Sequence, residues 1–414
     1  MKQRTFLLFI LCLALISAGC RSTNSGSASQ PGQGQPVAQA TKISEINPKA
    51  SGVEQNHQSK KEDGPESKQS SQGLSIFDVN LSSPSFNPSR GDKVELRYNL
   101  SVDSKVTVSV YDADQQLVKV LVSDAQRKAG ENKEWWDGKD LDGKLVANEA
   151  YFFCIESKDN SNQTVVYDPT TFSGGESADI AEGQANPESG TVNYKLSQPA
   201  RVLMRAGIPG SALLKTVVDW EPRPAGEVTE YWNGKDEDGL IDIWNLKDYR
   251  LVLTYMTLPD ATVITFGNNK YNYHDYKTSL KAGRPQKESR PMSNLRKLSP
   301  HFLKSRITDR AFKVRLVFPE LDQGQSNTIP SVKDHILVRV DVPDKDRHVL
   351  LNQQYEIILL VDTAFHAEEE RGYLPFNFPW ELKDLPPGEH LLTVNIVTSG
   401  DQIGVGSRRI RVVK

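Results

Sequence analysis

The sequence has little cysteine, and the three residues it has cannot form a disulfide framework. Cys12 lies in an apolar N-terminal stretch that we expect to be removed, and Cys20 directly follows that stretch. Cys154 is then left without a partner, which excludes the disulfide-stapled scaffolds of small secreted domains. Its neighbours in residues 151–155 are large and apolar, so we expect a buried structural thiol rather than a nucleophile.

The chain also lacks an excess of charge of either sign. Its 50 Lys and Arg residues and 53 Asp and Glu residues give a formal net charge of −3. No global field therefore favours nucleic acid or an acidic substrate, and we expect no nucleic-acid partner. With 414 residues, the chain has room for two to four domains.

Catalytic and cofactor motifs are missing as well. We find no Gly-x-Ser-x-Gly elbow, Walker loop, Gly-rich dinucleotide turn, His-Glu-x-x-His pair or Cys-x-x-Cys-His haem site. His366 and the three glutamates at 368–370 come nearest to a metal cluster, but this run is typical of an exposed loop. His390 fits the start of a strand better than a catalytic base. We therefore expect no catalytic residue, no metal and no cofactor.

A ten-residue motif occurs twice, and the rest of the chain is organised around it. Residues 134–143 read Glu-Trp-Trp-Asp-Gly-Lys-Asp-Leu-Asp-Gly, and residues 230–239 read Glu-Tyr-Trp-Asn-Gly-Lys-Asp-Glu-Asp-Gly, with seven of ten positions identical. The offset of 96 residues, from Trp135 to Tyr231, continues without a gap into neighbouring segments. A repeat of this length indicates one small domain that has been duplicated.

Each copy has the pattern of short antiparallel strands. Val94, Leu96, Tyr98 and Leu100 alternate with polar residues, which indicates a strand with one buried and one solvated face. Short strands separated by turns predict a β-sandwich. We expect the motif to end a strand, to bury its second large aromatic ring and to form a tight turn. The structural residues of the motif are then Trp136, Asp137, Gly138, Asp140 and Gly143, and in the second copy Trp232, Asn233, Gly234, Asp236 and Gly239.

The Asp-x-Asp-Gly part of the motif also imitates the start of a calcium loop. The glutamate that ends such a loop at position twelve is missing from both copies. Calcium binding stays open as an alternative to a turn that caps its own backbone.

The first copy resembles a known family. Residues 87–89, 106–111, 117–121, 129–130 and 150–152, together with the motif, resemble the Ig-like domain of the flagellar hook-capping protein (FlgD-type). The resemblance covers about residues 74–172, and residues 178–267 more loosely, since Asn233 replaces the usual Asp. It implies Ig-like modules that serve as spacers, docking parts or assembly parts, in which the motif residues are structural. No flagellar role follows, because the module is reused widely.

The N-terminus has the features of an export signal. Lys2 and Arg4 precede an apolar run at residues 6–16, which is too short to span a membrane as a stable helix. Residues 16–20 resemble a bacterial lipobox, which implies cleavage before Cys20 and its lipidation, and several acyl chains give stable anchoring. Arg21 resembles the pattern that permits release to the outer membrane, so we expect the outer rather than the inner membrane. An ordinary secretory signal with a coincidental cysteine, and retention in the inner membrane, stay open.

Two polar segments separate or extend the folded parts. Residues 20–73 are rich in Ser, Gln, Asn, Gly, Pro and Lys, and predict a disordered tether with an end-to-end distance of roughly 40 Å. Between residues 277 and 313 there are eleven Lys and Arg residues but only two acidic ones. This stretch is either a solvated linker or a strip that docks an anionic partner, namely lipid, acidic protein or glycan. The side chains of the predicted strip are Tyr271, Tyr273, Tyr276, Arg284, Lys287, Arg290, Arg296 and Lys297.

Residues 311–414 predict a third β domain without the motif. Strands are expected at 313–318, 335–342, 355–361, 390–397 and 405–413. Residues 375–394 resemble Ig-like accessory domains of bacterial surface proteins.

The sequence thus predicts an all-β chain of three Ig-like antiparallel sandwiches in series. We expect a signal peptide (1–19), a lipidated Cys20 with a tether (20–73), two FlgD-type domains (74–172 and 173–268), a basic linker (269–310) and a C-terminal Ig-like domain (311–414). The predicted function is that of a lipid-anchored envelope scaffold that docks a protein partner. The alternative is a carbohydrate-binding or adhesin-like surface lipoprotein.

Overall fold

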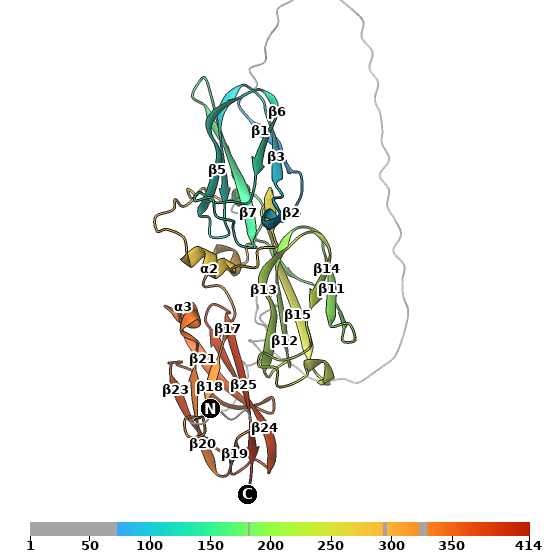
Figure 1. The fold of residues 1–414 in the computed structure, drawn as a ribbon, viewed down its shortest axis with the longest axis vertical. Coiled ribbons are helices and arrows are strands. Elements are labelled where there is room, and N and C mark those ends of the chain that lie inside the picture. Colours follow the sequence, from blue (N-terminus) through green and yellow to red (C-terminus); the bar gives the residue numbers. More distant parts are fainter. Residues whose placement is uncertain (1–72, 181–182, 293–295, 323–328) are drawn as a thin grey trace, which may run out of the picture. The chain divides into compact units, whose positions relative to one another are not determined.

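The computed structural model describes residues 73–180, 183–292, 296–322 and 329–414 (Figure 1). The predicted signal peptide, Cys20 and the tether up to residue 72 lie outside these residues. Within them the chain is mainly β-strand, and the prediction of an all-β fold built from Ig-like sandwiches is confirmed. No helix in these ranges combines the length and the apolar character needed to cross a bilayer.

The first sandwich consists of two sheets that share one core. One sheet has the strand order β1-β3-β6, and the other has the order β2-β16-β7-β4-β5, with β8 paired to β7. The apolar residues that alternate along β3 and β7 are buried between these sheets. The strands are β1 (Ile76–Leu81), β2 (Ser85–Phe86), β3 (Val94–Leu100), β4 (Ser104–Tyr111), β5 (Leu117–Arg127), β6 (Gly130–Trp136), β7 (Ala150–Asp159), β8 (Thr164–Tyr167) and β16 (Thr262–Thr265), with 3-10 turns η1 (Pro88–Arg90) and η2 (Pro169–Thr171).

The second sandwich repeats this plan with fewer strands. Its sheets have the orders β10-β11-β14 and β13-β12-β15-β9. The elements are β9 (Ser177–Asp179), β10 (Gln184–Asn186), β11 (Thr191–Leu196), β12 (Ala200–Gly207), β13 (Leu213–Arg223), β14 (Gly226–Tyr231), η3 (Ile243–Asn245) and β15 (Arg250–Thr257).

Details at the 96-residue offset repeat in the two sandwiches. The hydroxyl of Tyr98 donates to Glu134 over 3.3 Å, and that of Tyr194 donates to Glu230 over 2.8 Å. Each of these glutamates also pairs with an arginine, at 2.8 Å in the first copy and 2.7 Å in the second. The strand register shifts in the β4–β5 pair next to Asp124, which has a φ of 49°. It shifts in the β12–β13 pair next to Trp220, which has a φ of 51°. The duplication therefore extends to buried polar contacts and a β-bulge.

The boundary after the second sandwich differs from the sequence expectation. We expected residues 173–268 to form one domain, yet β16 pairs with β7 and β2 of the first sandwich. Val263 of β16 is buried in the core of that sandwich. The pattern of one short strand does not identify the sheet that it joins.

The third sandwich has one large and one small sheet. Their strand orders are β17-β25-β24-β21-β22, with β19 paired to β25, and β18-β20-β23. The elements are β17 (Phe312–Lys313), β18 (Arg315–Val317), β19 (Ser331–Val332), β20 (His335–Asp341), η5 (Asp344–Asp346), α3 (Arg347–Leu350), β21 (Tyr355–Val361), β22 (Ala364–Glu369), β23 (Phe376–Glu381), β24 (Gly388–Thr398) and β25 (Ile403–Val412). Trp380 and the inward residues of β20, β21 and β24 fill its core.

The second and third sandwiches share an interface of their own. Leu214 packs in one apolar cluster with Ile358 and Leu360. The side chain of Asn395 pairs with the backbone of Leu213, donating to its carbonyl and accepting from its N–H, both over 2.9 Å. The buried amide thereby satisfies the backbone of a strand from the other sandwich.

Candidate functional site in the basic segment and the domain junction

The tryptophans of the duplicated motif are buried in both sandwiches. Trp136 is 1% exposed and Trp232 is 7% exposed. Each indole N–H donates over 2.9 Å to a carbonyl of its own turn, that of Lys139 or Lys235. Trp136 also contacts the rings of Phe86, Tyr151 and Phe153 edge-on. The motif thus anchors a turn to the core.

The remaining motif residues shape that turn. The side chains of Asp137 and Asn233 each accept from the N–H two residues further on, over 3.1 Å. Gly138 has a φ of 70°, and a Cβ there would lie 2.3 Å from Pro88, so only glycine fits. Positive φ angles also occur at Gly143, Gly234 and Gly239. Asp140 accepts from two backbone N–H groups and Asp236 from one.

The carboxylates that imitate a calcium loop bind cationic and hydroxyl groups of this chain. Arg284 donates to Asp140 over 2.9 Å and to Asp142 over 2.8 Å, and the hydroxyl of Tyr276 donates to Asp140 over 3.0 Å. In the second copy, Asp238 pairs with Lys313 over 2.9 Å. In both copies the last aspartate of the turn thus receives a basic side chain from a later part of the chain.

The aromatic residues of the basic segment, residues 269–310, fold onto the first sandwich. Asn272 caps the short helix α2 (Tyr273–Thr278), which places Tyr273 and Tyr276 in the core of that sandwich. The hydroxyl of Tyr273 donates to Asp114 over 2.9 Å. Burial, reinforced by nearby carboxylates, raises the pKa of Tyr273 well above its ordinary value, so this hydroxyl stays a donor. Tyr271 is half-buried, and its hydroxyl donates to the carbonyl of Leu145.

The basic side chains of the segment pair with carboxylates of the first two sandwiches. Lys287 lies 2.6 Å from Asp168, and Arg296 lies 2.9 Å from Glu176. Lys277 pairs with Asp112, and the side chains of both are buried. Backbone hydrogen bonds add to these ion pairs. The N–H of Leu117, at the start of the edge strand β5, donates to the carbonyl of Pro285, and the N–H of Lys287 donates to the carbonyl of Gln115.

Six of the eight side chains predicted for a partner-binding strip are therefore buried or half-buried against other parts of the chain. Arg290 and Lys297 are exposed, and Arg290 lies 3.8 Å from the neighbouring Glu288. The pattern of bases and aromatics left two interpretations open, a solvated linker and a strip that docks an anionic partner. The structure places carboxylates of this same chain against the segment, chiefly those of the first sandwich.

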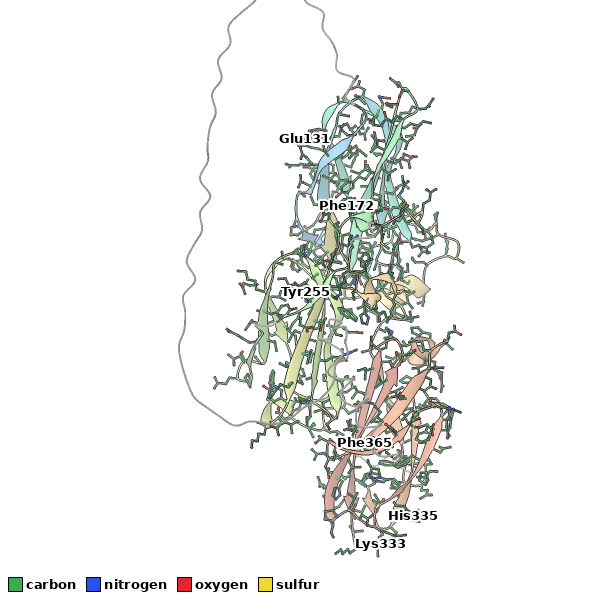
Figure 2. All side chains as sticks on the ribbon, turned by 180° about the vertical axis from the view of Figure 1, so that it is seen from behind. Glu131, Phe172, Tyr255, Lys333, His335 and Phe365 are labelled. Carbon is green, nitrogen blue, oxygen red and sulfur yellow. The ribbon has the colours of Figure 1, made fainter. Side chains whose placement is uncertain are left out.

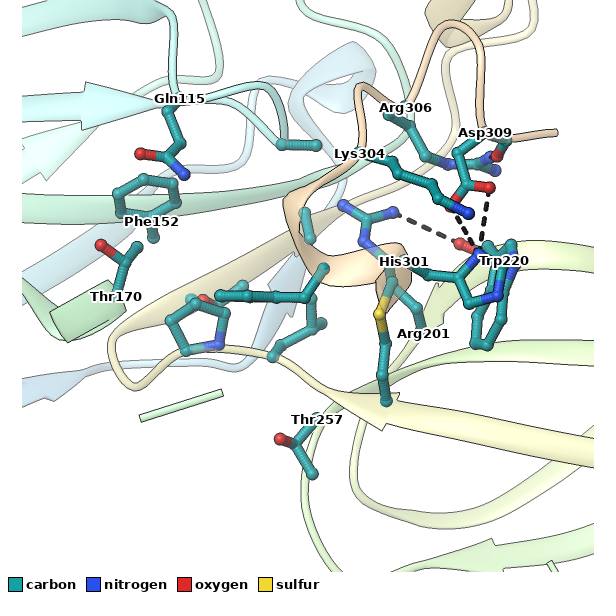
Figure 3. A pocket seen from close by; sticks show the side chains of 17 residues that line it. Gln115, Phe152, Thr170, Arg201, Trp220, Thr257, His301, Lys304, Arg306 and Asp309 are labelled. Carbon is teal, nitrogen blue, oxygen red and sulfur yellow. Dashed lines mark hydrogen bonds and ion pairs between the residues drawn. The ribbon is translucent and has the colours of Figure 1, made fainter. Parts of the chain in front are cut away.

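The last part of the basic segment places Arg306 between the first and second sandwiches, and Figure 3 shows it near Lys304 and Asp309. The backbone N–H of Arg306 donates to Asp114 over 2.6 Å. Its guanidinium group donates to the carbonyl of Asp219 and, over 3.2 Å, to Glu221. Burial alone would lower the pKa of Arg306, but the surrounding carboxylates outweigh it and raise the pKa. Arg306 therefore stays charged at the junction.

Further buried charges complete this junction. Glu149 of the first sandwich and Arg201 of the second are both buried and lie 2.7 Å apart. His301 lies 2.9 Å from Asp309, which also accepts from Gln402 of the third sandwich. Burial alone would raise the pKa of Asp309, but the hydrogen bonds from His301 and Gln402 outweigh it and lower the pKa. Each sandwich thus contributes a polar side chain to one network.

Two cavities adjoin the junction. The one in Figure 3 has a volume of about 50 Å³ and lies beside Trp220 and His301. This is far below the roughly 300–1,000 Å³ of sites for drug-sized ligands. The other has a volume of about 350 Å³ and is lined by Asn148, Glu149, Glu221 and residues 268–273. Asn148 and Asn268 use their side chains to bind backbone groups.

The other sequence candidates have structural surroundings. Cys154 is buried, and this raises the pKa of its thiol far above the ordinary value. His366 packs against the rings of Phe378 and Trp380, and burial lowers its pKa. Among the described residues, no three His, Cys, Asp or Glu side chains are grouped so that they could hold a metal.

The sequence reasoning missed Glu149, Arg201 and Arg306. Arg201 lies between Ala200 and Val202, whereas Glu149 follows Asn148 and Arg306 follows Ser305. The charge that interrupts the apolar strand at Arg201 was the only local signal. It could not identify partners separated by 52 residues, as Glu149 and Arg201 are.

Residues 83–161 match the family of FlgD Ig-like domains, which confirms the resemblance for the first sandwich. No curated protein sequence matches the chain.

Solved structures with similarity to this chain include the following three. FlgD from P. aeruginosa is 27% identical over 21% of this chain and 67% of that chain, with a TM-score of 0.19. The fibronectin(III)-like modules of Clostridium thermocellum CbhA are 10% identical over 81% of this chain and 93% of theirs, with a TM-score of 0.18. A bacterial ice-binding adhesin is 11% identical over 82% of this chain and 98% of that chain, with a TM-score of 0.18.

Proposed function

We propose that this chain, with its FlgD Ig-like domain at residues 83–161, is a lipid-anchored docking protein of the bacterial cell envelope. Cys20 carries the anchor, the outer membrane is its location, and the sandwiches bind a protein partner without catalysis. The observation that carries the proposal is that the basic segment forms ion pairs with carboxylates of this same chain. A protein partner would therefore bind at other exposed surfaces of the sandwiches.

The open surface that suits a protein partner best is the strand β22. It lies at the edge of its sheet and, among the described strands, pairs only with β21. Phe365 on this strand is 49% exposed and is labelled in Figure 2. An exposed edge is a template for an extended segment of another chain.

Charge around β22 indicates the chemistry of that segment. Burial, reinforced by Glu370, raises the pKa of Glu368. Burial, reinforced by Glu368 and Glu370, also raises the pKa of Glu356 on the neighbouring strand. A lysine or arginine from the partner would relieve this repulsion between like charges. The proposed partner therefore presents an extended segment with basic side chains.

Photo-crosslinking from a residue at position 365 in intact cells tests the docking surface. We expect a crosslinked protein band that is absent when the crosslinker replaces the exposed Lys247 of the second sandwich. The double variant E368K/E370K should remove the band. Equal bands from positions 365 and 247, or no band, would refute docking at β22.

Mass spectrometry of the N-terminal peptide tests the anchor separately. We expect acylated Cys20 in the envelope fraction, and release of the C20A variant from that fraction. An unmodified Cys20 would refute lipid anchoring and would leave docking at β22 to be judged by crosslinking.

A further inference from the structure

The two FlgD-type sandwiches each expose one large aromatic ring at the same place. Trp135 on β6 is 56% exposed, and Tyr231 on β14 is 81% exposed. Both strands lie at the edges of their three-stranded sheets. Each ring directly precedes the buried tryptophan of the motif, so it points to the outer face of the sheet. The cores do not use these rings, and their exposure has no structural explanation within the chain.

The duplication allows the outer faces to be compared position by position. The strand pairs β3–β6 and β11–β14 have six equivalent outward positions: 95, 97, 99, 131, 133 and 135 in the first copy, and 191, 193, 195, 227, 229 and 231 in the second. Four of these change their chemical class between the copies. Glutamate at 131 and 227 and an aromatic residue at 135 and 231 are retained. The position of Glu131 is labelled in Figure 2.

The outer face of the second sandwich is rich in uncharged hydrogen-bonding groups. Thr191 lies directly across from Tyr231 in the strand register, and its hydroxyl lies 2.7 Å from that of Ser189. The hydroxyl of Thr229 donates to Asn193 over 2.6 Å. Gln184 and Asn186 on β10 continue this surface of amides and hydroxyls.

Neither face has a net charge that would attract an ion. On the first face, Arg97 pairs with Glu95 and Lys133 pairs with Glu131. On the second, Lys195 and Glu227 pair with each other. An anionic lipid surface or a highly charged protein segment therefore gains little from either face.

We propose that the outer faces of the two FlgD-type sandwiches bind one neutral linear polysaccharide through Trp135 and Tyr231. The flat aromatic rings stack on the apolar faces of sugar rings. Sugar hydroxyls bond to the amides and hydroxyls of the second face, and to the ion-paired side chains of Glu95, Arg97, Glu131 and Lys133 on the first face. Two linked sites on one polymer give avidity that neither site has alone. This function goes beyond docking of a protein at β22 and uses other strands.

Native affinity electrophoresis of the full chain in non-ionic detergent tests the proposal. Separate gels contain hydroxyethylcellulose, galactomannan or a soluble β-1,3-glucan. We expect one of these to retard the wild-type chain. W135A and Y231A should each weaken binding by about 100-fold, because the loss of one site removes the avidity, and the double variant should migrate as in a gel without polysaccharide.

The control is Y373A, which removes an exposed aromatic ring from the third sandwich and should bind like the wild type. Because all three rings are exposed, the melting temperatures should stay close to that of the wild type. The proposal is overturned if no gel retards the wild-type chain, or if the double variant is retarded like the wild type. It is also overturned if Y373A abolishes retardation. Loss of crosslinking at β22 would leave these results unaffected.

Discussion

The contact between Arg284 and the motif turn gives the sharpest prediction about stability. In R284M the apolar stem of the side chain stays, but the guanidinium group that binds Asp140 and Asp142 is lost. The Arg284 side chain is only 6% exposed and that of Asp140 is fully buried, so Asp140 would keep a buried charge with fewer partners. Removing one partner of a buried ion pair costs about 3–5 kcal/mol.

We expect the lower end of this range, about 3 kcal/mol, because Asp140 keeps other hydrogen bonds. Two backbone N–H groups and the hydroxyl of Tyr276 still donate to it. Native-state hydrogen exchange measures the effect for each sandwich separately. Amides of β4 and β7 should exchange about 100-fold faster, since each 1.4 kcal/mol corresponds to a factor of ten. Amides of β21 and β24 in the third sandwich should be unchanged.

The chain offers a matched control on the same carboxylate. Lys281 also lies near Asp142, at 3.4 Å, but its side chain is 83% exposed. K281M should therefore change stability by less than about 0.5 kcal/mol. If R284M and K281M have equal effects, or if R284M leaves exchange in β4 and β7 unchanged, the basic segment does not stabilise the first sandwich through this contact.

Three further predictions concern the core, the junction and a buried histidine. W136A should lower the free energy of unfolding of the first sandwich by about 3–5 kcal/mol, whereas W135A should change it by less than about 0.5 kcal/mol. Equal effects of the two variants in urea unfolding would contradict the buried role of Trp136. R306M should lower the stability of the junction by about 3 kcal/mol and should speed tryptic cleavage within residues 296–322. R290M should leave the rate of this cleavage unchanged. Unchanged cleavage in R306M would contradict the role of Arg306. Burial alone lowers the pKa of His390, but hydrogen bonds to Asp362 and to the Pro386 carbonyl outweigh burial and raise the pKa. The contribution of His390 to stability is therefore complete below its unfolded pKa of about 6.5, and it is lost as the pH rises through the folded pKa. H390Q should therefore destabilise more at about pH 5.5 than at about pH 8.5 in thermal melts, and an equal loss at both would show that protonation of His390 is irrelevant.

Local pattern was sufficient to predict strands such as β3 and the role of the motif, but the expectation of an exposed loop at His366, Glu368 and Glu369 was wrong, because these residues lie on the strand β22. The alternation around Tyr98 identifies β3, and the Asp-Gly and Asp-x-Asp-Gly signals identify the turn after Trp136. Both depend on residues that are close in sequence. The offset of 96 residues carried the same conclusions to the second copy.

The pairing of distant segments could not be predicted in this way. Tyr273 and Tyr276 lie in a Pro-interrupted basic stretch, and nothing in that stretch reveals that the first sandwich has room for two more rings. Likewise, the bases of the segment indicate an anionic partner but not its identity. Asp112, Asp140 and Asp168 are scattered along the chain, and only the fold brings them to the basic segment.

Lysine labelling of the full chain in non-ionic detergent tests most directly whether the basic segment is bound by the chain itself. The side chains of Lys277 and Lys287 are buried in ion pairs, whereas Lys281 in the same segment is exposed. With an acetylating reagent and mass spectrometry, we expect fast labelling of Lys281 and slow labelling of Lys277 and Lys287. Equal labelling of all three would show a segment that is free to dock elsewhere and would contradict the proposed division between internal contacts and open docking surfaces.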